Sequence, residues 1–415
     1  MELRIVAGPA SAAGPESFAD HAARLGGIPR GSRAADVIPT LEASGLLGRG
    51  GAGFPVGRKW RSVASRDGGA PVVLVNAAEG EPLSAKDRSL LELRPHLVLD
   101  GALVAADAIC ANRIVLYVGS AHRDARASAT RALRERPDLR VAVEIVDAPP
   151  AYVAGEESAA VHFLNAADAR PTTTPPRPYE RGVGGRPTLV QNAESLAHAA
   201  LIARNGAGWY RELGRAGTPG TALVTISGAD GRGVREIELG TPLGELAIDS
   251  GAGRGPADRQ AVLLGGYFGG WQSIERSWDL PLDPVALGEA GTSFGAGVIA
   301  FLGNDQCGVR ATASIMGWMA GQSAAQCGPC VFGLRAIADA TSRLANGSAE
   351  RDDLARITRW SQQLAGRGAC RHPDGAVGQL WSSIRVFAGE WELHQVRGRC
   401  SREILADWAA DRRVA

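Results

Sequence analysis

A glycine-rich run between Gly48 and Gly57, with five glycines in ten residues, constrains this chain more than any other feature. Glycine has no Cβ, so such a loop lets backbone N–H groups approach a bound ligand closely. When a helix follows, the loop forms a cradle for phosphate. Phe54 and Pro55 within the run argue against a mobile glycine linker, which is the competing interpretation. Because the spacing matches neither the dinucleotide fingerprint nor the Walker loop, the run by itself predicts only a nucleotide- or phosphate-binding loop.

Lysine is rare in this chain, and its positions draw attention to the same region. Lys and Arg together number 45, yet only Lys59 and Lys86 are lysines. An ammonium is a compact point charge and a guanidinium is a planar fork, so a tight anionic site discriminates between them. The two lysines therefore mark candidate functional segments.

Composition limits the class of protein. A chain of 415 residues with 45% apolar content is expected to form two or three domains. The net charge of +1 gives no electrostatic footprint for nucleic acid or an anionic membrane surface. No secretory signal is seen at the start, and no run approaches the length of a membrane span. We therefore expect a cytoplasmic protein that is not inserted in a membrane and that reaches one only through partner subunits.

The first half of the chain alternates between strand and helix patterns. Such alternation predicts an α/β layer with a mostly parallel sheet, in which ligands lie beyond the carboxyl ends of the strands. Asn76 and the Gly155–Glu157 segment follow strands and are placed accordingly. The expected strands are 71–76, 113–118 and 141–146, and the expected helices are 34–47, 97–111 and 122–136.

The second half changes character twice. A proline-rich loop and a helix are followed by strands with one short helix among them, which is typical of a β-grasp-like unit, and then by helices. No internal repeat is present. The expected elements are a loop at 171–187, a helix at 192–204, strands at 222–227, 234–239 and 261–265, and helices from about 309 with loops at 346–347 and 366–375.

Carboxylates follow two of the predicted strands. Glu79 and Glu81 come after the first strand, and Glu156 and Glu157 after the third. Carboxylates at strand ends line a pocket wall and accept hydrogen bonds from a polar ligand, although a solvated turn explains each pair equally well. The histidines, His162 and His394 among them, are expected to be surface or core residues rather than ligands.

The cysteines give a sharper signal. Cys327 and Cys330 form a CxxC pair at the start of a helix, and Cys370 follows forty residues later. This spacing suits an iron–sulfur cluster or zinc, and no thioredoxin-like context surrounds it. Cys110 and Cys307 are expected to be ordinary buried cysteines, and Cys400 lies near a polar tail.

Taken together, these segments resemble the FMN- and NADH-binding flavoprotein subunit of bacterial respiratory complex I, which has relatives in NAD-reducing hydrogenases and formate dehydrogenases. The resemblance extends from about residue 36 to 395, and four motifs carry it in the family's order and spacing. The matching segments are Gly48–Pro55 with Gly57, Lys59 and Trp60; Asn76, Glu79, Glu81, Pro82 and Lys86–Arg88; Ala151, Tyr152 and Gly155–Glu157; and Gly185–Thr188 with Asn192 and Glu194.

The resemblance implies an α/β fold with three parts. These are a Rossmann-like FMN domain (1–215), a β-grasp domain of the SLBB type (216–305) and a helical bundle with an iron–sulfur motif (306–415). It implies an FMN-dependent NAD(P)H dehydrogenase that passes electrons to an iron–sulfur centre or a ferredoxin-like partner. Glu81 and Glu157 would act at the nicotinamide. The cofactor-binding residues would be Gly48, Arg49, Gly50, Gly51, Gly53, Phe54, Lys59, Asn76, Glu79, Gly155, Glu156, Gln191 and Asn192.

The metal motif departs from the family. Ala324 stands where the family has its first cysteine, so Cys327, Cys330 and Cys370 remain as three of four ligands. Four outcomes are open. A [4Fe–4S] cluster takes its fourth ligand from water, a nearby side chain or a partner; a [3Fe–4S] cluster forms; the metal site is lost; or zinc binds the three cysteines and His372.

The nicotinamide side departs as well. Ser62 and Arg177 replace two aromatic positions of the family, Thr174 replaces a lysine, and Ala78 replaces an aspartate of the flavin motif. Loss of two stacking faces weakens nucleotide binding by roughly 1–3 kcal/mol. The alternative function is therefore a flavin-bearing electron relay or scaffold subunit that does not oxidise nicotinamide.

Overall fold

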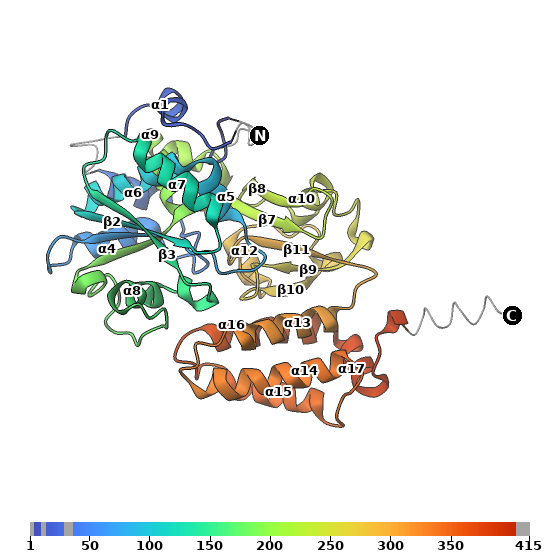
Figure 1. Ribbon diagram of the computed structural model, residues 1–415. Helices are drawn as coiled ribbons and strands as arrows, with labels where there is room; N and C mark the ends of the chain where they lie inside the picture. The colour runs from blue at the N-terminus through green and yellow to red at the C-terminus, as the bar shows by residue number, and fades with distance from the viewer. Residues whose placement is uncertain (1–3, 10–13, 29–35, 404–415) are drawn as a thin grey trace.

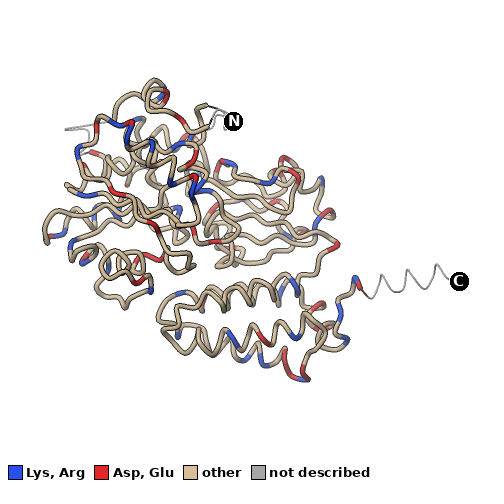
Figure 2. Tube along the Cα trace, in the orientation of Figure 1, with Lys and Arg blue, Asp and Glu red and all other residues tan. Residues whose placement is uncertain are grey.

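The computed structural model describes residues 4–9, 14–28 and 36–403 (Figure 1). It is a mixed α/β fold with two main sheets, and a group of helices packs beneath the second sheet (Figure 1). Acidic and basic residues are interspersed along the whole trace (Figure 2), in keeping with the net charge of +1. No helix among the described residues is long and apolar enough to cross a bilayer.

The first sheet has four parallel strands in the order β3-β2-β1-β4. Residues Val72 to Val75 are fully buried, as expected for a central strand of a parallel sheet that is covered on both faces. Val73 and Val75 face one apolar core, whereas Val72 and Leu74 face another. The strands are β1 (Val72–Ala77), β2 (Arg113–Gly119), β3 (Ala142–Ala148) and β4 (Thr188–Asn192).

The helices around this sheet divide between its two faces. The core that contains Val73 also holds apolar residues of α6 and α9, and the core that contains Val72 holds those of α8. The helices of this part are α1 (Phe18–Leu25), α3 (Val37–Ser44), α4 (Val56–Ala64), α5 (Lys86–Leu93), α6 (Pro95–Ile109), α7 (Arg123–Glu135), α8 (Glu157–Ala166) and α9 (Ala193–Arg211).

The strand order reverses between β1 and β4, and this reversal decides where a ligand binds. The chain runs from β1 outward to β2 and β3, then returns to place β4 on the other side of β1. In doubly wound sheets the crevice for a ligand opens at this switch point, beyond the carboxyl ends of the strands. Asn76 of β1 and Asn192 of β4 are register partners at that edge.

The second sheet is mixed, with the order β10-β9-β11-β7-β8 and one parallel pair, β7 with β11. Its own core includes Val224 and Ile226 of the sheet and Leu243 and Leu246 of α10. The elements of this part are β7 (Thr221–Ser227), β8 (Gly233–Glu238), α10 (Leu243–Asp249), β9 (Arg259–Leu264), β10 (Gly270–Ser273), α11 (Ile274–Ser277), α12 (Pro284–Glu289) and β11 (Val298–Gly303), preceded by the short pair β5 (Gly214–Arg215) and β6 (Thr218–Pro219).

The last part of the described chain is helical. It shares one apolar core with the second sheet through Leu263 and Trp271, and the amide of Trp271 donates to Ser382 Oγ at 2.8 Å. The helices are α13 (Gly308–Gly321), a π-helical turn (Pro329–Leu334), α14 (Arg335–Ala345), α15 (Asp353–Leu364), α16 (His372–Val386) and α17 (Ala388–Arg397).

Most predicted elements are confirmed, with two kinds of difference. The loop expected at 366–375 ends early because α16 begins at His372 with Pro373 in its first turn, where the missing N–H of proline costs nothing. Elements that the sequence pattern does not predict include β4, β10, β11, α5 and α8. The first two residues of the helix expected at 34–47 lie outside the described residues, and its observed part is α3. The domain boundaries stay predictions.

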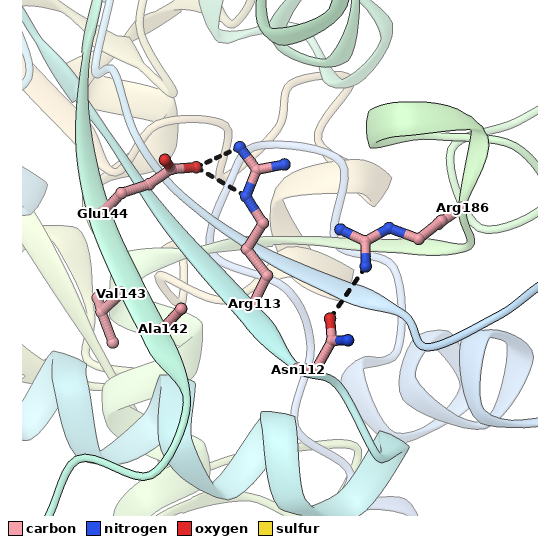
Figure 3. Close-up of a pocket in the computed structure, with 6 residues that line it drawn as sticks. All are labelled: Asn112, Arg113, Ala142, Val143, Glu144 and Arg186. Carbon is pink, nitrogen blue, oxygen red and sulfur yellow. Dashed lines mark hydrogen bonds and ion pairs between the residues drawn. The ribbon is translucent and has the colours of Figure 1, made fainter.

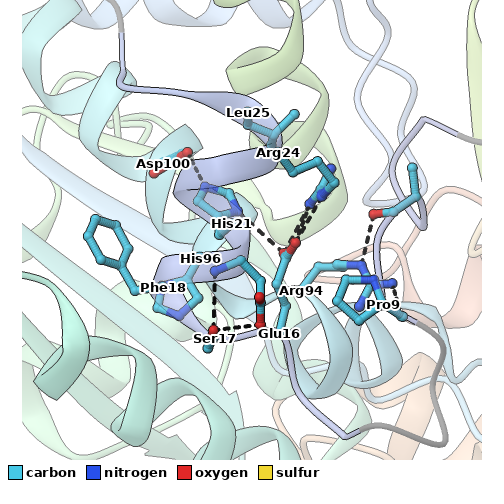
Figure 4. A network of polar contacts seen from close by, with 12 residues as sticks. Pro9, Glu16, Ser17, Phe18, His21, Arg24, Leu25, Arg94, His96 and Asp100 are labelled. Atoms are coloured by element: carbon cyan, nitrogen blue, oxygen red, sulfur yellow. Dashed lines mark hydrogen bonds and ion pairs between the residues drawn. The ribbon is translucent and has the colours of Figure 1, made fainter.

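A buried polar network fastens α1 to the first sheet's helices (Figure 4). His21 Nε2 lies 2.7 Å from Asp100 Oδ2, and Asp100 Oδ1 lies 2.5 Å from Arg136 Nη1. Arg204 also pairs with Asp100. Burial alone would raise the pKa of Asp100, but His21 and the two arginines lower it to about 2. Asp100 is therefore an ionised carboxylate that three cationic or polar partners share.

We predict that Asp100→Asn destabilises the protein by about 3–5 kcal/mol, because it leaves buried arginines without their counter-charge. The lowered pKa means that the pairing contributes fully above the ordinary value of 3.8 and is lost as the pH falls toward about 2. Urea unfolding at neutral pH and near pH 3 measures both effects. Asp107→Asn, an exposed site on the same helix, is the control. Equal stability of the Asp100 and Asp107 variants would contradict the prediction.

Candidate functional site

The glycine loop lies against the switch point of the first sheet. A Cβ at Gly50 would lie 3.3 Å from Cβ of Asn192, which is tighter than most Cβ contacts, so the loop passes close to this strand end. Gly51 and Gly53 have φ values of 103° and 63°, which glycine adopts readily. The loop also forms a bridge with the second sheet's side of the molecule, between Gly51 and Gly295. The loop thus lies along the strand edge where a doubly wound sheet is expected to bind its ligand, and we refer to this edge with its flanking segments as the crevice.

The two asparagines at this edge hold the segments that surround it. Asn76 Nδ2 donates to the carbonyl of Gly155 at 2.8 Å, which brings the third predicted motif to the first. Asn192 Nδ2 donates to Asp87 Oδ2 at 2.6 Å, and its Oδ1 caps α9. Gln191 is buried, and its Oε1 has no hydrogen-bond partner among the described residues. A buried unpaired acceptor of this kind is typical of a position that a ligand completes.

Lys59 lies in α4, the helix that follows the loop. Its Nζ lies 2.5 Å from Glu157 Oε2, so the pair joins α4 to α8 across the crevice. The side chains of Lys59 and Glu157 are 22% and 29% exposed and remain accessible to a ligand. A loop, a helix N-terminus and an ammonium that converge in this way attract an anion.

Three side chains predicted to bind the cofactor, those of Arg49, Glu79 and Glu156, form hydrogen bonds within the protein. Glu79 accepts from the amides of Asp87 and Arg88 at 2.9 and 3.0 Å. Glu156 caps α8, and Arg49 donates to the carbonyl of Thr221 at 2.9 Å. Burial, followed by the charge of Asp87, raises the pKa of Glu79. These contacts hold the segments beside the strand edge, and the roles of Arg49, Glu79 and Glu156 toward a cofactor stay predictions.

Lys86 is structural. Its Nζ lies 2.9 Å from Asp87 Oδ1 and 2.8 Å from Glu194 Oε2, and the residue is 3% exposed. Burial alone would lower the pKa of Lys86, but the carboxylates of Asp87 and Glu194 raise it. Glu194 also accepts from the amide of Leu223 in the second sheet at 2.8 Å. The lysine thus fastens the site to the neighbouring sheet and does not face the crevice.

Glu81 lies where all three parts of the molecule meet. Its Oε2 accepts from the amide of Tyr267 at 2.9 Å and from the Tyr152 hydroxyl at 3.2 Å. Burial is the main reason that its pKa is raised to about 7. The Tyr152 ring in turn packs edge-on against Trp318 and Phe268, each with centroids 5.1 Å away. A carboxyl group that titrates near neutrality in a buried, multi-element contact is a candidate functional group.

The nicotinamide side keeps one aromatic residue at its surface. Phe54 is 50% exposed on the loop, which suits a stacking face. Ser62 Oγ donates to the carbonyl of Arg58 at 2.9 Å within α4, and it offers no such face. Thr174 and Arg177 are exposed on the proline-rich loop. Ala78 is buried in the apolar core that contains Val72, and its amide donates to Asn76 Oδ1 at 3.3 Å.

The three predicted metal ligands come together at one end of the helical part. Cys327 precedes the π-helical turn, Cys330 lies in it, and Cys370 precedes α16. Burial, followed by the nearby Cys327 and Cys370 thiols, raises the pKa of Cys330 to about 12. Three sulfurs within each other's influence fit an iron–sulfur cluster.

The zinc alternative fits less well. A mononuclear zinc ion needs sulfur and nitrogen atoms about 2.0–2.3 Å from one centre. The ligand atoms of Cys327, Cys330, Cys370 and His372 are not among those that gather within 4.8 Å in the described part of the chain. His372 Nε2 instead lies 2.8 Å from the Met319 carbonyl. The described geometry therefore does not form that mononuclear site.

The crevice and the cysteine group adjoin each other. The backbone amide of Tyr152 donates to Gln322 Oε1 at 3.0 Å, and Gln326 Nε2 donates to the carbonyl of Pro171 at 3.0 Å. Burial raises the pKa of Cys370, and the charge of Glu156 adds to the rise. Glu156, which caps α8 beside the crevice, therefore lies close enough to Cys370 for its charge to act on a predicted cluster ligand.

A separate pocket of about 260 Å³ lies at the opposite edge of the first sheet (Figure 3). It opens at the amino ends of β2 and β3, where Arg113 pairs with Glu144 and Arg186 donates to Asn112 Oδ1 at 2.9 Å. None of the predicted site residues lines it. This pocket is therefore not the predicted site.

Two expectations about the remaining cysteines need correction. Cys110 is exposed and not buried, because it ends α6 in the left-handed conformation at the surface. Cys307 is half-buried, and its Sγ lies 3.3 Å from His394 Nε2. His394 is a core residue, as expected, but it lies beside two thiols.

Comparison with known proteins connects these features to a family. A model described as the Nuo51 FMN-binding domain matches residues 41–200, and one described as the NADH-ubiquinone oxidoreductase-F iron-sulfur binding region matches 310–394. The F subunit of NADH-quinone oxidoreductase from Streptomyces coelicolor is 30% identical over 377 residues, which cover 88% of this chain and 84% of that protein. Its counterpart from Mycobacterium tuberculosis is 31% identical, with 88% and 86% covered.

Hydrogenase subunits are similar too. The HndC subunit of the NADP-reducing hydrogenase from Solidesulfovibrio fructosivorans is 28% identical, with 97% of this chain and 86% of that protein covered. Crystal structures of NAD+-reducing [NiFe]-hydrogenase superpose with TM-scores of 0.79 (air-oxidised) and 0.80 (H2-reduced), at 29% and 28% identity. They cover 87% and 92% of this chain but 63% and 66% of the hydrogenase chain, so this chain spans less than two thirds of its length.

We predict that Glu81 makes stability fall as the pH rises from about 4.5 to about 7, since the folded state holds the proton longer than the unfolded chain does. The full effect is about 3 kcal/mol. Glu81→Gln removes this dependence, whereas Glu289→Gln, at an exposed site, leaves it in place. Urea unfolding at pH 5 and pH 8 gives the comparison. A Glu81→Gln variant whose pH dependence equals that of the wild type would refute the assignment.

Proposed function

The chain belongs to the family of the NADH-quinone oxidoreductase F subunit, and on that premise we propose that it is an FMN-dependent oxidoreductase that takes hydride from NAD(P)H and delivers electrons to an iron–sulfur centre. The observation that carries the proposal is the glycine loop packed on Asn192 at the switch point and followed by α4, whose Lys59 pairs with Glu157. The match to an FMN-binding domain over residues 41–200 supports it.

The residues of the crevice fit FMN. Gly50 has no side chain, so a ligand could approach its backbone closely. Gln191 Oε1 has no donor among the described residues, and a group of the ligand could supply one. Lys59 and the first turn of α4 would hold the phosphate, and Asn76 and Asn192 would fix the walls beside the ring. When bound, FMN supplies hydride acceptance from reduced nicotinamide and one-electron transfer onward.

The nucleotide would bind on the open side of the loop. Phe54 would stack on it, and the carboxyl groups of Glu81 and Glu157 would orient the nicotinamide. Glu157 also holds Lys59, so it couples the two ligands' sites. Glu81 changes its protonation near neutral pH, and ionisation there would favour hydrogen bonds with a donor group of the nucleotide.

Electrons would leave through the cysteine group. Cys327, Cys330 and Cys370 would hold a [4Fe–4S] or [3Fe–4S] cluster, and the second family match, at 310–394, supports an iron–sulfur region there. Ser323, the residue before Ala324, is the candidate for the nearby side chain that takes the place of the missing cysteine. The contacts of Tyr152 and Gln326 bring this group against the crevice.

The protein would work as one subunit of a larger assembly. The relatives' names describe subunits of NADH-quinone oxidoreductases and hydrogenases. We propose a ferredoxin-like or other iron–sulfur partner, a cytoplasmic location, and domain boundaries near residues 215 and 305. The departures at Ser62, Thr174 and Arg177 lower the expected affinity for the nucleotide. The alternative is an electron relay or scaffold subunit that does not oxidise nicotinamide, and a flavin titration distinguishes it from a dehydrogenase.

Anaerobic titration of the FMN-loaded protein with NADH and NADPH tests the proposal. We expect at least one of them to bleach the flavin absorbance with one hydride per flavin. Lys59→Met should weaken FMN binding roughly 10- to 100-fold, as loss of a charge-assisted hydrogen bond predicts. Arg58→Met, on an exposed neighbouring residue, should bind FMN like the wild type. If neither nucleotide reduces bound flavin, the protein is the electron relay and the dehydrogenase proposal fails.

Restoring the fourth cysteine provides a second test. Ala324→Cys should give a cluster that loses iron to a chelator several-fold more slowly, because four thiolates hold it instead of three. Ala325→Cys places a thiol one residue away, at an exposed position, and should not have this effect. Iron analysis with electron paramagnetic resonance gives the result. An equal rate of iron loss in Ala324→Cys and in the wild type would show that Ala324 does not occupy a ligand position.

A further inference from the structure

A second group of metal-binding side chains lies away from the crevice, where the helical part begins and ends. Cys307 immediately precedes α13, His394 lies in α17, and Cys400 follows that helix. One ligand atom of each residue lies within 4.8 Å of those of the other two. Cys400 and His394 are 2% and 0% exposed, and Cys307 is half-buried. Nothing in the proposed electron transfer uses it.

The histidine is already oriented as a metal ligand. Its Nδ1 lies 2.9 Å from the carbonyl of Leu344, which only accepts, so Nδ1 carries the hydrogen. Nε2 therefore presents its lone pair, and it lies 3.3 Å from Cys307 Sγ. A ring nitrogen that donates to a backbone carbonyl while the other faces a metal is the usual arrangement for a ligating histidine.

A carboxylate lies next to Cys400, outside the group whose ligand atoms all lie within 4.8 Å of one another. Glu403 Oε2 lies 3.5 Å from Cys400 Sγ, and its Oε1 accepts from Arg310 Nη2 at 2.6 Å. Two thiolates and one carboxylate carry three negative charges, which a divalent cation and Arg310 balance. Arg310 thus serves as the outer partner that orients the carboxylate.

We propose that Cys307, His394 and Cys400 form a mononuclear zinc site, completed by Glu403, that clamps the segment after α17 onto the first turn of α13. Two sulfurs, one imidazole nitrogen and a carboxylate oxygen are ligands that zinc takes in a tetrahedral site. A mixed set of this kind favours zinc over a cluster, which prefers thiolates alone. The ion replaces the thiol protons and binds the two ends of the helical part together.

Elemental analysis and X-ray absorption of the full chain, purified anaerobically with a reductant and zinc, test the proposal. We expect about one zinc per chain, with two sulfurs at about 2.3 Å and nitrogen or oxygen at about 2.0–2.1 Å. The Cys307→Ser/Cys400→Ser double variant should lose the zinc. Cys110→Ser, at an exposed cysteine, should keep it. Cys327→Ser should keep the zinc while it loses iron, so this test is independent of the proposed electron-transfer centre.

Other results overturn the proposal. Wild-type protein that carries no zinc after gel filtration excludes the site. An X-ray absorption spectrum with three or more sulfurs around zinc also excludes it, because such a spectrum would assign the zinc to Cys327, Cys330 and Cys370. An intact mass lighter by two hydrogens, with Cys307 and Cys400 cross-linked in peptide mapping, shows a disulfide instead. The spectrum of the wild type decides the matter even if the double variant does not fold.

Discussion

The buried carboxylate of Glu194 is the contact on which the position of the crevice depends. It pairs with Lys86 at 2.8 Å, accepts from the amide of Leu223 at 2.8 Å and lies 3.7 Å from Arg49 Nε. These partners belong to α5, the second sheet and the glycine loop. Burial of such charges is costly unless each is matched, and here the matched set fixes three segments at the start of α9. The glycine loop therefore meets the sheet edge in one position.

That fixed edge explains how one chain combines two redox sites. The parallel sheet brings Asn76 and Asn192 together at the switch point. The hydrogen bond from Asn76 to the carbonyl of Gly155 holds the next segment in place beside them. Tyr152, a few residues earlier, reaches the second sheet and the helices through Glu81 and Trp318. The cysteine group thus adjoins the crevice because one short segment contacts all three parts of the fold.

The sequence predicts much of this, and its failures have physical causes. The apolar run at Val72–Val75 is enough to predict a buried strand, and the cysteine spacing is enough to predict a metal-binding motif, because each depends on local pattern. Strand β4 escapes prediction, since five residues after a proline carry too little periodicity, although the resemblance assigns Gln191 and Asn192 to the cofactor. Lys86 stands out for its rarity, yet it is buried between carboxylates, which no pattern in one sequence reveals.

Long-range contacts are the hardest to foresee. Cys307 and His394 are 87 positions apart and form no spacing motif, so only the folded chain brings them together. The raised pKa of Glu81 likewise arises from burial in the folded chain, which outweighs the hydrogen bond from the amide of Tyr267, 186 positions away. The side chains of Arg49, Glu79 and Glu156, which the resemblance assigns to the cofactor, also make contacts within the protein that no sequence pattern reveals.

A crystal structure of the protein with FMN decides whether the crevice at the β1–β4 switch point holds this cofactor. We expect difference density for the phosphate beside Gly50 and Lys59 and for the ring beside Asn76 and Asn192. Density for FMN elsewhere, such as in the pocket lined by Arg113 and Arg186, with the glycine loop empty, would contradict this expectation.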